Sequence, residues 1–308
     1  MRLSPVTRYG LRAVALIYLF VLLIVPVTLI FWRSFEHGVG QFWEWITTPA
    51  AISALQLSLA IVAIVVPLNV VFGIVTALAL VRGRFPGKGI LQAVVDLPFA
   101  VSPVVVGVAL ILLWGYGGWF GGIESAGFRI IFGFPGLVLA TIFVTLPFVV
   151  REVEPVLREI GTEQEQAAAT LGANGWQTFS RITLPAIRWG LTYGIVLTVA
   201  RSLGEYGAVM MVSSNFPGIS QTLTLLVHSR YVDDYNEYGA YAAATLLMLV
   251  AIAVLIAMTL IERGAQSRVG DTDEAAGDEP STGEAPAEDA APAVPYGPAS
   301  TEPHKEGM

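Results

Sequence analysis

Residues 162–185 read TEQEQAAATLGANGWQTFSRITLP and form a polar stretch within an otherwise apolar region of the chain. Apolar runs at 134–150 and 188–212 border this stretch on its two sides. The whole connection between those runs, residues 151–187, is far longer than the roughly two to eight residues that usually join helices. A connection of this length predicts a folded loop that docks on another protein.

The first part of this loop has the sequence pattern of a short capped helix. Thr162 suits the N-cap, Glu165 suits the third position of a capping box, and Gly172 suits the left-handed residue that ends a helix. A second amphipathic turn is expected over 176–181, and we expect it to stop before Pro185. The pattern therefore predicts two short helical segments that project from a membrane.

Long apolar runs account for most of the chain. Of its 308 residues, 55% are hydrophobic and 13% are charged, and a soluble globule lacks the polar surface to cover so much apolar material. A membrane-spanning helix needs about 20 mostly apolar residues. Runs of this kind lie at 13–32, 52–81, 90–114, 134–150, 188–212 and 239–261. The sequence therefore predicts an all-α integral membrane protein with six transmembrane helices, and it excludes an ordinary soluble enzyme.

The distribution of Lys and Arg sets the expected orientation of these spans. Twelve lie in the N-terminus, the second and fourth loops and the start of the tail, whereas the other three loops hold one each. Positively charged loops face the cytoplasm, so we expect both termini and residues 151–187 to be cytoplasmic. The expected division is a cytoplasmic N-terminus over 1–12, a six-span domain over 13–262 and a cytoplasmic tail over 263–308.

The tail has the composition of a disordered segment. Residues 264–308 contain ten Asp and Glu and six Pro but a single aromatic residue, which is too little apolar surface to offset the entropy lost on folding. The net charge of -7 belongs to this segment, and the rest of the chain has no basic patch typical of nucleic-acid binding. Because Cys is absent and the three His are far apart, we expect no metal site and no cofactor in this chain.

Part of the polar loop is similar to a motif of ABC importer permeases. From residue 166 the chain reads Gln-Ala-Ala-x3-Gly-x9-Ile-x-Leu-Pro, which resembles the EAA loop except that Gln166 stands where the family has Glu. In that family the loop helix sits in a groove on a cytoplasmic ATPase and transmits its motion. The residues that the resemblance assigns to this coupling are Glu163, Glu165, Gln166, Ala167, Ala168, Gly172, Ile182, Leu184 and Pro185.

Further blocks narrow the resemblance to permeases of sulfate/thiosulfate importers. The blocks are FPG at 85–87, DLPFAVSPVV at 96–105, TLPFVVRE at 145–152 and ARSLGEYGAV at 200–209. They are similar to the W-type permeases of that family, and the likeness covers roughly residues 10–262. It implies a six-helix core of the type I importer kind. It also implies a T-type permease as the second subunit, two ATPase subunits and an extracytoplasmic binding protein that delivers the anion.

Two opposite charges lie inside the fifth apolar run. Arg201 and Glu205 are four residues apart and therefore share one face of a helix. A lone charge at the centre of a bilayer costs at least about 2.5–3.5 kcal/mol. The pair is therefore one of two things. It is either a structural ion pair, or Arg201 offers a positive charge to a passing oxyanion while Glu205 keeps Arg201 from binding that anion too tightly to release it. Gly204 and Gly207 predict close approach of another helix, as at an interface or a gate.

An acidic residue and two prolines mark the third apolar run. Asp96 would repel an anion, so we expect it to pair with a cation from another helix or to cap a helix segment broken by Pro98 and Pro103. A structural kink is one interpretation of the prolines. The other is a helix N-terminus directed at a water-lined cavity, where Ser102 would donate a hydrogen bond to an anion.

Together these features predict a permease subunit that forms the translocation path of an ATP-driven sulfate or thiosulfate importer. We expect ATP hydrolysis in a partner subunit, because the glycine-rich segment 83–89 lacks the spacing and the Ser or Thr of a Walker A loop. One alternative is the same architecture with molybdate or another oxyanion as cargo. A second is a stand-alone secondary transporter or channel, which predicts internal repeats and coupling-ion carboxylates.

Overall fold

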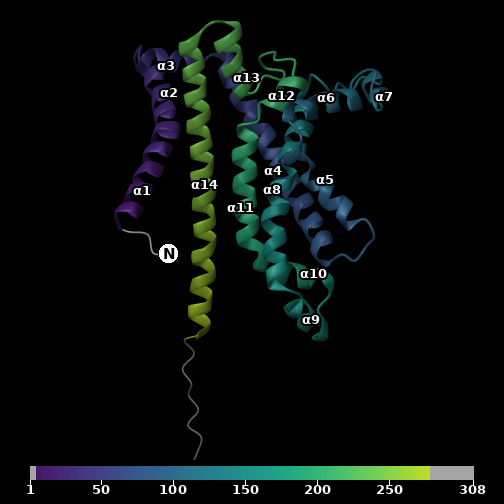
Figure 1. Cartoon of the computed structure of the whole chain (residues 1–308). Helices are drawn as coiled ribbons and strands as arrows, with labels where there is room; N and C mark the ends of the chain where they lie inside the picture. The colour runs from purple at the N-terminus through teal and green to yellow at the C-terminus, as the bar shows by residue number, and fades with distance from the viewer. Residues whose placement is uncertain (1–4, 278–308) are drawn as a thin grey trace, which may run out of the picture. The chain divides into compact units, whose positions relative to one another are not determined.

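Apolar helices dominate the structure, a computed structural model that describes residues 5–277 (Figure 1). Five helices in this part are long and apolar enough to cross a membrane, and a bent helix pair makes a sixth crossing if it counts as one broken span. The five are Tyr9–Phe35, Pro49–Arg82, Phe134–Ile160, Gly175–Leu203 and Glu237–Leu260. The described regular elements are all helical, so the predicted all-α membrane class is confirmed.

The first span is exposed over most of its length. It consists of α1 (Pro5–Leu19), the π-helical turn η1 (Phe20–Ile24) and α2 (Val25–Phe35), and it begins before the expected residue 13 because proline is well tolerated in the first turn of a helix. None of the residues in its apolar window is buried by the rest of the chain. The short helix α3 (Val39–Ile46) then leads into the central bundle.

Three long helices form the central bundle: α4 (Pro49–Arg82), α8 (Phe134–Ile160) and α11 (Leu184–Leu203) (Figure 1). Small residues let them approach closely, since a Cβ placed on Gly73 would lie 2.5 Å from the side chain of Val149. The core at one end of the bundle contains Leu80, Val150, Val153, Leu157 and Ile187. Deeper in the bundle, Asn69 donates a buried hydrogen bond of 2.6 Å to the hydroxyl of Thr145.

The third apolar run is not one straight helix, which corrects the expectation for 90–114. It forms α5 (Lys88–Ala100) and α6 (Pro103–Trp114), which are bent by 116° relative to each other. Pro103 lacks the N–H that would continue the hydrogen-bond ladder across the break, and it suits the first turn of a new helix. The observed break is therefore much larger than the kink that the two prolines alone suggest.

The fifth span also differs from the predicted run at 188–212. It starts earlier, because α10 (Gly175–Thr178) and the π-helical turn η2 (Phe179–Thr183) lead without interruption into α11. The expected stop before Pro185 was wrong, since the wider turn accommodates a residue that cannot donate a backbone hydrogen bond. The span ends at Leu203, and α12 (Gly207–Val212) follows after a short break.

The remaining elements form the last span and the end of the bundle opposite the polar loop. These are α7 (Gly121–Ser125), α13 (Leu223–His228), η3 (Ser229–Asp233) and α14 (Glu237–Gly277). Helix α14 continues past the expected end of the membrane domain at residue 262, because internal hydrogen bonds can extend a helix beyond its apolar part. The helix thus includes residues 263–277, which the sequence assigns to the tail, and residues 278–308 lie outside the described part of the chain.

Candidate functional site

Arg201 and Glu205 meet at the break between α11 and α12. Arg201 lies in the last turn of α11, and Glu205 follows the capping residue Gly204. Nη1 of Arg201 is 2.7 Å from Oε2 of Glu205, whose side chain is 1% exposed. Oε1 of Glu205 accepts a hydrogen bond of 2.9 Å from the backbone N–H of Ala208 in the first turn of α12. The buried carboxylate thus joins a guanidinium to a helix N-terminus, both of which favour negative charge.

A cavity of about 310 Å³ opens beside this ion pair. It lies between the break of the third span and α8, and its lining residues are Pro98, Phe99, Ala100, Val101, Ser102, Pro103, Val144, Phe148 and Arg201. Arg201 is the one charged residue of this lining, and its side chain is 34% exposed. A water occupies about 30 Å³ of liquid volume, so the cavity has room for an oxyanion with several waters.

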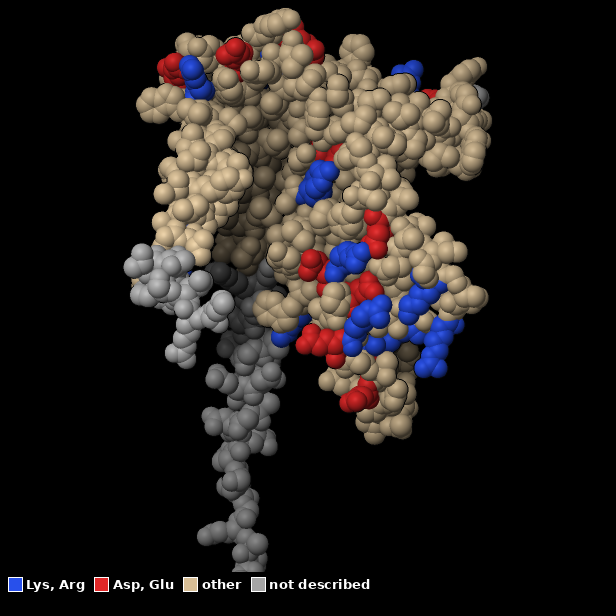
Figure 2. Space-filling view, viewed as in Figure 1, with Lys and Arg blue, Asp and Glu red and all other residues tan. Residues whose placement is uncertain are grey.

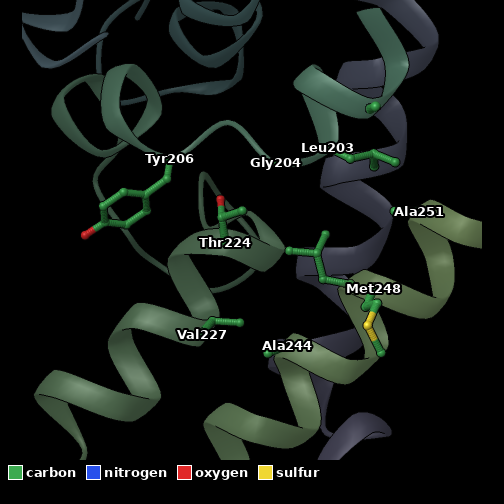
Figure 3. Close-up of a pocket in the computed structure, with 10 residues that line it drawn as sticks. Leu203, Gly204, Tyr206, Thr224, Val227, Ala244, Met248 and Ala251 are labelled. Carbon is green, nitrogen blue, oxygen red and sulfur yellow. The ribbon is translucent and has the colours of Figure 1, made fainter. Parts of the chain in front are cut away.

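The break between α11 and α12 also borders a second cavity, of about 320 Å³, on the side of α13 and α14 (Figure 3). Its lining is mostly apolar and includes Leu203, Val227 and Met248. The hydroxyl of Thr224 at its edge donates a hydrogen bond of 2.8 Å to the backbone carbonyl of Glu205. An unpaired anion is costly in such surroundings, so the cavity beside Arg201 is the candidate path for an ion.

Ser102 and Gly207 lie at the breaks of the two broken spans. Ser102 is the N-cap of α6 and its hydroxyl makes no capping bond, so it is free to act at the cavity. A Cβ on Gly207 would lie 3.1 Å from Cβ of Pro103, which is a close approach between α12 and α6. At Gly204, by contrast, the nearest atom to such a Cβ is the carbonyl oxygen of Ala200 in its own helix, at 3.6 Å.

Asp96 pairs with a cation from another helix, as one of the two sequence interpretations predicts. Its Oδ1 lies 2.5 Å from Nη2 of Arg151 on α8, and Nε2 of Gln92 is 3.4 Å from its Oδ2. The two side chains of the ion pair are 32% and 48% exposed. Asp96 is absent from the lining of the Arg201 cavity. The structure therefore separates it from the other predicted path residues.

The polar loop forms the short helix α9 (Glu163–Thr170), with Thr162 as its N-cap. Gly172 has φ of +85° and so takes the left-handed conformation that we expected at the end of this helix. The predicted capping box is wrong, because the side chain of Thr162 makes no cap hydrogen bond. Its hydroxyl instead accepts a bond of 2.9 Å from Nε2 of Gln166, and Glu165 is turned toward Arg82.

The residues of the importer-like motif divide between an exposed surface and the bundle. Exposed residues are Glu163, Gln166, Ala167, Gly172 and Pro185, whereas Glu165, Ala168, Ile182 and Leu184 are partly buried. Leu184 packs on the core of the bundle. Two large apolar side chains that the motif does not include, Leu171 and Trp176, are 88% and 74% exposed. An exposed leucine and tryptophan on a polar loop are typical of a protein–protein contact.

Two arginines were missed by sequence reasoning. Arg82 at the end of α4 contacts Glu165, which is 83 positions away in the sequence. The local sequence around either residue does not predict this contact. Arg230 in η3 is 5% exposed and donates hydrogen bonds to the carbonyls of Gly239 and Trp45 and to the hydroxyl of Thr48, at 3.0, 3.0 and 2.8 Å. Its burial lowers the pKa of its guanidinium. The sequence presents it only as a loop charge.

Charged side chains gather at the two ends of the molecule on the face in Figure 2. One group surrounds the ends of α5 and α8 near the α9–α10 segment, another lies at the opposite end, and a mostly uncharged band separates them. This is the distribution expected of a protein whose middle contacts lipid. Within residues 5–277, no group of three or more His, Asp or Glu is placed to hold a metal ion.

Comparison with known proteins agrees with this geometry. Residues 69–267 match the family described as binding-protein-dependent transport system inner membrane component. The chain belongs to this family. Its members are inner-membrane proteins that operate with a binding protein, and the several apolar helices of this member make it a multi-pass membrane protein.

Curated relatives of this family member extend over most of its length. It is 47% identical to the sulfate transport system permease protein CysW of Synechocystis, over 83% of this chain and 93% of the relative. It is 44% identical to CysW of Escherichia coli K12, over 78% and 83% of the two chains. It is 36% identical to the probable sulfate transport system permease protein cysT of Chlorokybus atmophyticus, over 84% and 91%.

A solved structure shows the same fold. It is the crystal structure of a bacterial ABC transporter involved in the import of the acidic polysaccharide alginate. The TM-score is 0.69 at 17% identity, over 83% of this chain and 95% of that chain. This chain therefore shares its fold with a chain of that transporter.

Proposed function

We propose that this chain is a permease subunit of an ABC importer for sulfate or thiosulfate. The structural observation that most supports this proposal is the cavity beside the α5–α6 break, where Arg201 is the one charged lining residue. The relatives named as sulfate permeases, at 44% and 47% identity over most of the chain, point to a sulfur oxyanion as cargo.

The ion path runs along the two broken spans. A divalent anion cannot cross hydrocarbon unpaired, so it needs polar groups and water, which broken helices provide at their freed backbone ends. Ser102 and Arg201 both line the cavity, and they offer a hydroxyl and a positive charge. Glu205 keeps Arg201 partly neutralised, so the ion is attracted and then released. Gly207 allows α12 and α6 to close on each other as a gate.

The α9–α10 segment couples this path to a separate ATPase. Its exposed surface, with Glu163, Gln166 and Ala167 beside Leu171 and Trp176, fits a groove on another protein. The excess of Lys and Arg in the loops at this end supports a cytoplasmic position for α9 and for both termini. Closure of two ATPase subunits on ATP moves α9, and the spans then switch the path from the cytoplasmic to the outer face.

The assembly that this mechanism needs has several other chains. A T-type permease completes the pore, two ABC ATPases bind ATP and Mg²⁺, and an extracytoplasmic sulfate-binding protein selects the anion. This chain itself holds no cofactor and carries out no catalytic step. The exposed first span, α1 to α2, is apolar enough to contact lipid or the second permease.

Purification and transport measurements test this function together. The full chain, expressed with its partner subunits, should retain an ATPase through purification, and proteoliposomes should take up labelled sulfate only with ATP and the binding protein present. Excess unlabelled thiosulfate should compete with this uptake. Uptake without any ATPase would contradict the proposal in favour of a secondary transporter or channel. Competition by molybdate in place of sulfate and thiosulfate would move the cargo to another oxyanion.

A further inference from the structure

Helix α9 is attached to the bundle by polar contacts and not by an apolar face. None of its eight residues is buried, whereas helices are normally held in place by burial of an apolar stripe. A helix without such packing slides or tilts freely unless a polar contact fixes it. A loop helix that moves the membrane spans therefore needs a firm polar connection to them.

Glu165 provides this connection. Its Oε2 lies 3.1 Å from Nε of Arg82 at the end of α4. Its Oε1 accepts hydrogen bonds from Nη2 of Arg82, at 3.2 Å, and from the hydroxyl of Thr183 in η2, at 3.0 Å. A two-point contact between arginine and carboxylate fixes orientation as well as distance. One carboxylate thus joins α9 to two other elements.

The same guanidinium holds the end of α8. Nη1 of Arg82 donates a hydrogen bond of 3.2 Å to the carbonyl of Leu157, and Nη2 donates to the carbonyl of Gly161, which caps α8. Carbonyls at a helix C-terminus lack partners within the helix and favour a cation. The side chains of Arg82 and Glu165 are 20% and 23% exposed, so solvent screens their attraction only in part.

We propose that Arg82 and Glu165 are a positioning pair that transmits movement of α9 to the ends of α4 and α8. The inference rests on the proposed coupling role of α9. When α9 shifts, Glu165 carries Arg82 with it, and Arg82 moves the end of α8 because it binds two of its carbonyls. Helix α8 contributes Val144 and Phe148 to the cavity that Arg201 lines. A displacement in the loop thereby reaches the wall of the ion path.

Glutamine substitutions in the complete reconstituted transporter test this role. Arg82→Gln and Glu165→Gln keep side-chain size but remove the charged contact. Both variants should retain the ATPase and hydrolyse ATP, while sulfate transported per ATP falls at least about tenfold, the lower limit of the factor that corresponds to loss of one charged hydrogen bond. The matched controls Arg84→Gln and Glu159→Gln remove exposed charges nearby in sequence and should leave the ratio unchanged.

A double variant separates one shared connection from two independent effects. Arg82→Gln with Glu165→Gln should lose no more transport per ATP than Arg82→Gln alone, because both changes interrupt the same connection between α9 and α8. A ratio that stays at the native value in both glutamine variants would overturn the proposal, and so would a double variant whose loss is the product of the two single losses. If Arg82→Gln does not assemble, Arg82→Lys replaces it, since this variant keeps the charge but loses the two-point contact with Glu165; an unchanged ratio in both Arg82→Lys and Glu165→Gln also overturns the proposal.

The outcomes also distinguish this inference from the proposed function. If the native complex retains no ATPase, the coupling role of α9 is wrong and the pair has no movement to transmit. If the native complex couples normally and the Arg82 and Glu165 variants do too, the importer function stands and only the positioning role fails.

Discussion

Replacing Glu205 with Gln should make the permease hold sulfate more tightly and release it more slowly. The native carboxylate lies 2.7 Å from Arg201. At an effective dielectric constant of about 20, a sulfate about 4 Å from the guanidinium gains ~8 kcal/mol, and a carboxylate roughly 7 Å from the ion returns ~5 kcal/mol of repulsion. The net attraction of the native site for sulfate is thus a few kcal/mol, which permits release. The neutral variant loses the repulsive contribution.

The measured effect will be smaller than this Coulomb difference, because Arg201 is 34% exposed and water screens its charge. An increase in sulfate affinity of about 100-fold corresponds to ~3 kcal/mol and is the expected size. The amide oxygen of Gln can still accept the hydrogen bond from Ala208, so the end of α12 keeps its partner. Glu205→Gln therefore changes the charge and leaves the local fold in place.

Two measurements on the assembled transporter check this prediction. Equilibrium binding of labelled sulfate in detergent should rise in Glu205→Gln, while uptake per ATP in proteoliposomes should fall because release becomes slow. Arg201→Met should lose both binding and uptake, since the remaining carboxylate repels the anion. If Glu205→Gln reduces uptake but leaves sulfate binding unchanged, the ion pair is a structural brace and the cargo does not meet Arg201.

Three further substitutions probe other parts of the molecule. Gly172→Val should leave ATP hydrolysis intact and reduce uptake, because a β-branched residue is strained at φ of +85°; normal coupling in vesicles would contradict this. Arg230→Met should lower the thermal unfolding midpoint of the purified complex by several degrees, since one buried and two partly buried acceptors lose their donor at a total cost of about 3 kcal/mol. Gly207→Val should force α12 away from Pro103, where a Cβ already lies at 3.1 Å, and slow uptake measurably without removing the subunit from the membrane.

The sequence predicts the features that depend on local composition. Apolar runs identify the spans because a bilayer demands about 20 apolar residues from each crossing helix. Spacing of four residues predicts the contact of Arg201 with Glu205, and the cost of an isolated charge predicts a partner for Asp96. The left-handed conformation of Gly172 follows from its place after a short helix.

Features that depend on backbone direction or on distant contacts could not be predicted in this way. Hydrophobicity does not report where a helix bends, so the break at 101–102 and the end of α11 at Leu203 are visible only in the structure. The capping box predicted at Thr162 does not form, because Glu165 binds the guanidinium of Arg82 instead. This guanidinium comes from another helix and is the stronger partner for a carboxylate. Such tertiary competition is absent from any single window of sequence.

The uninterrupted helix Gly175–Leu203 has a mechanical consequence. Its 29 residues correspond to a rod about 44 Å long at 1.5 Å per residue, which starts beside α9 and ends next to Arg201. For a stiff rod of this length, a tilt of about 5° at one end displaces the other by roughly 4 Å. That travel exceeds the diameter of a water molecule. A small tilt of this helix is therefore enough to admit water to the space through which an ion passes, or to exclude water from it.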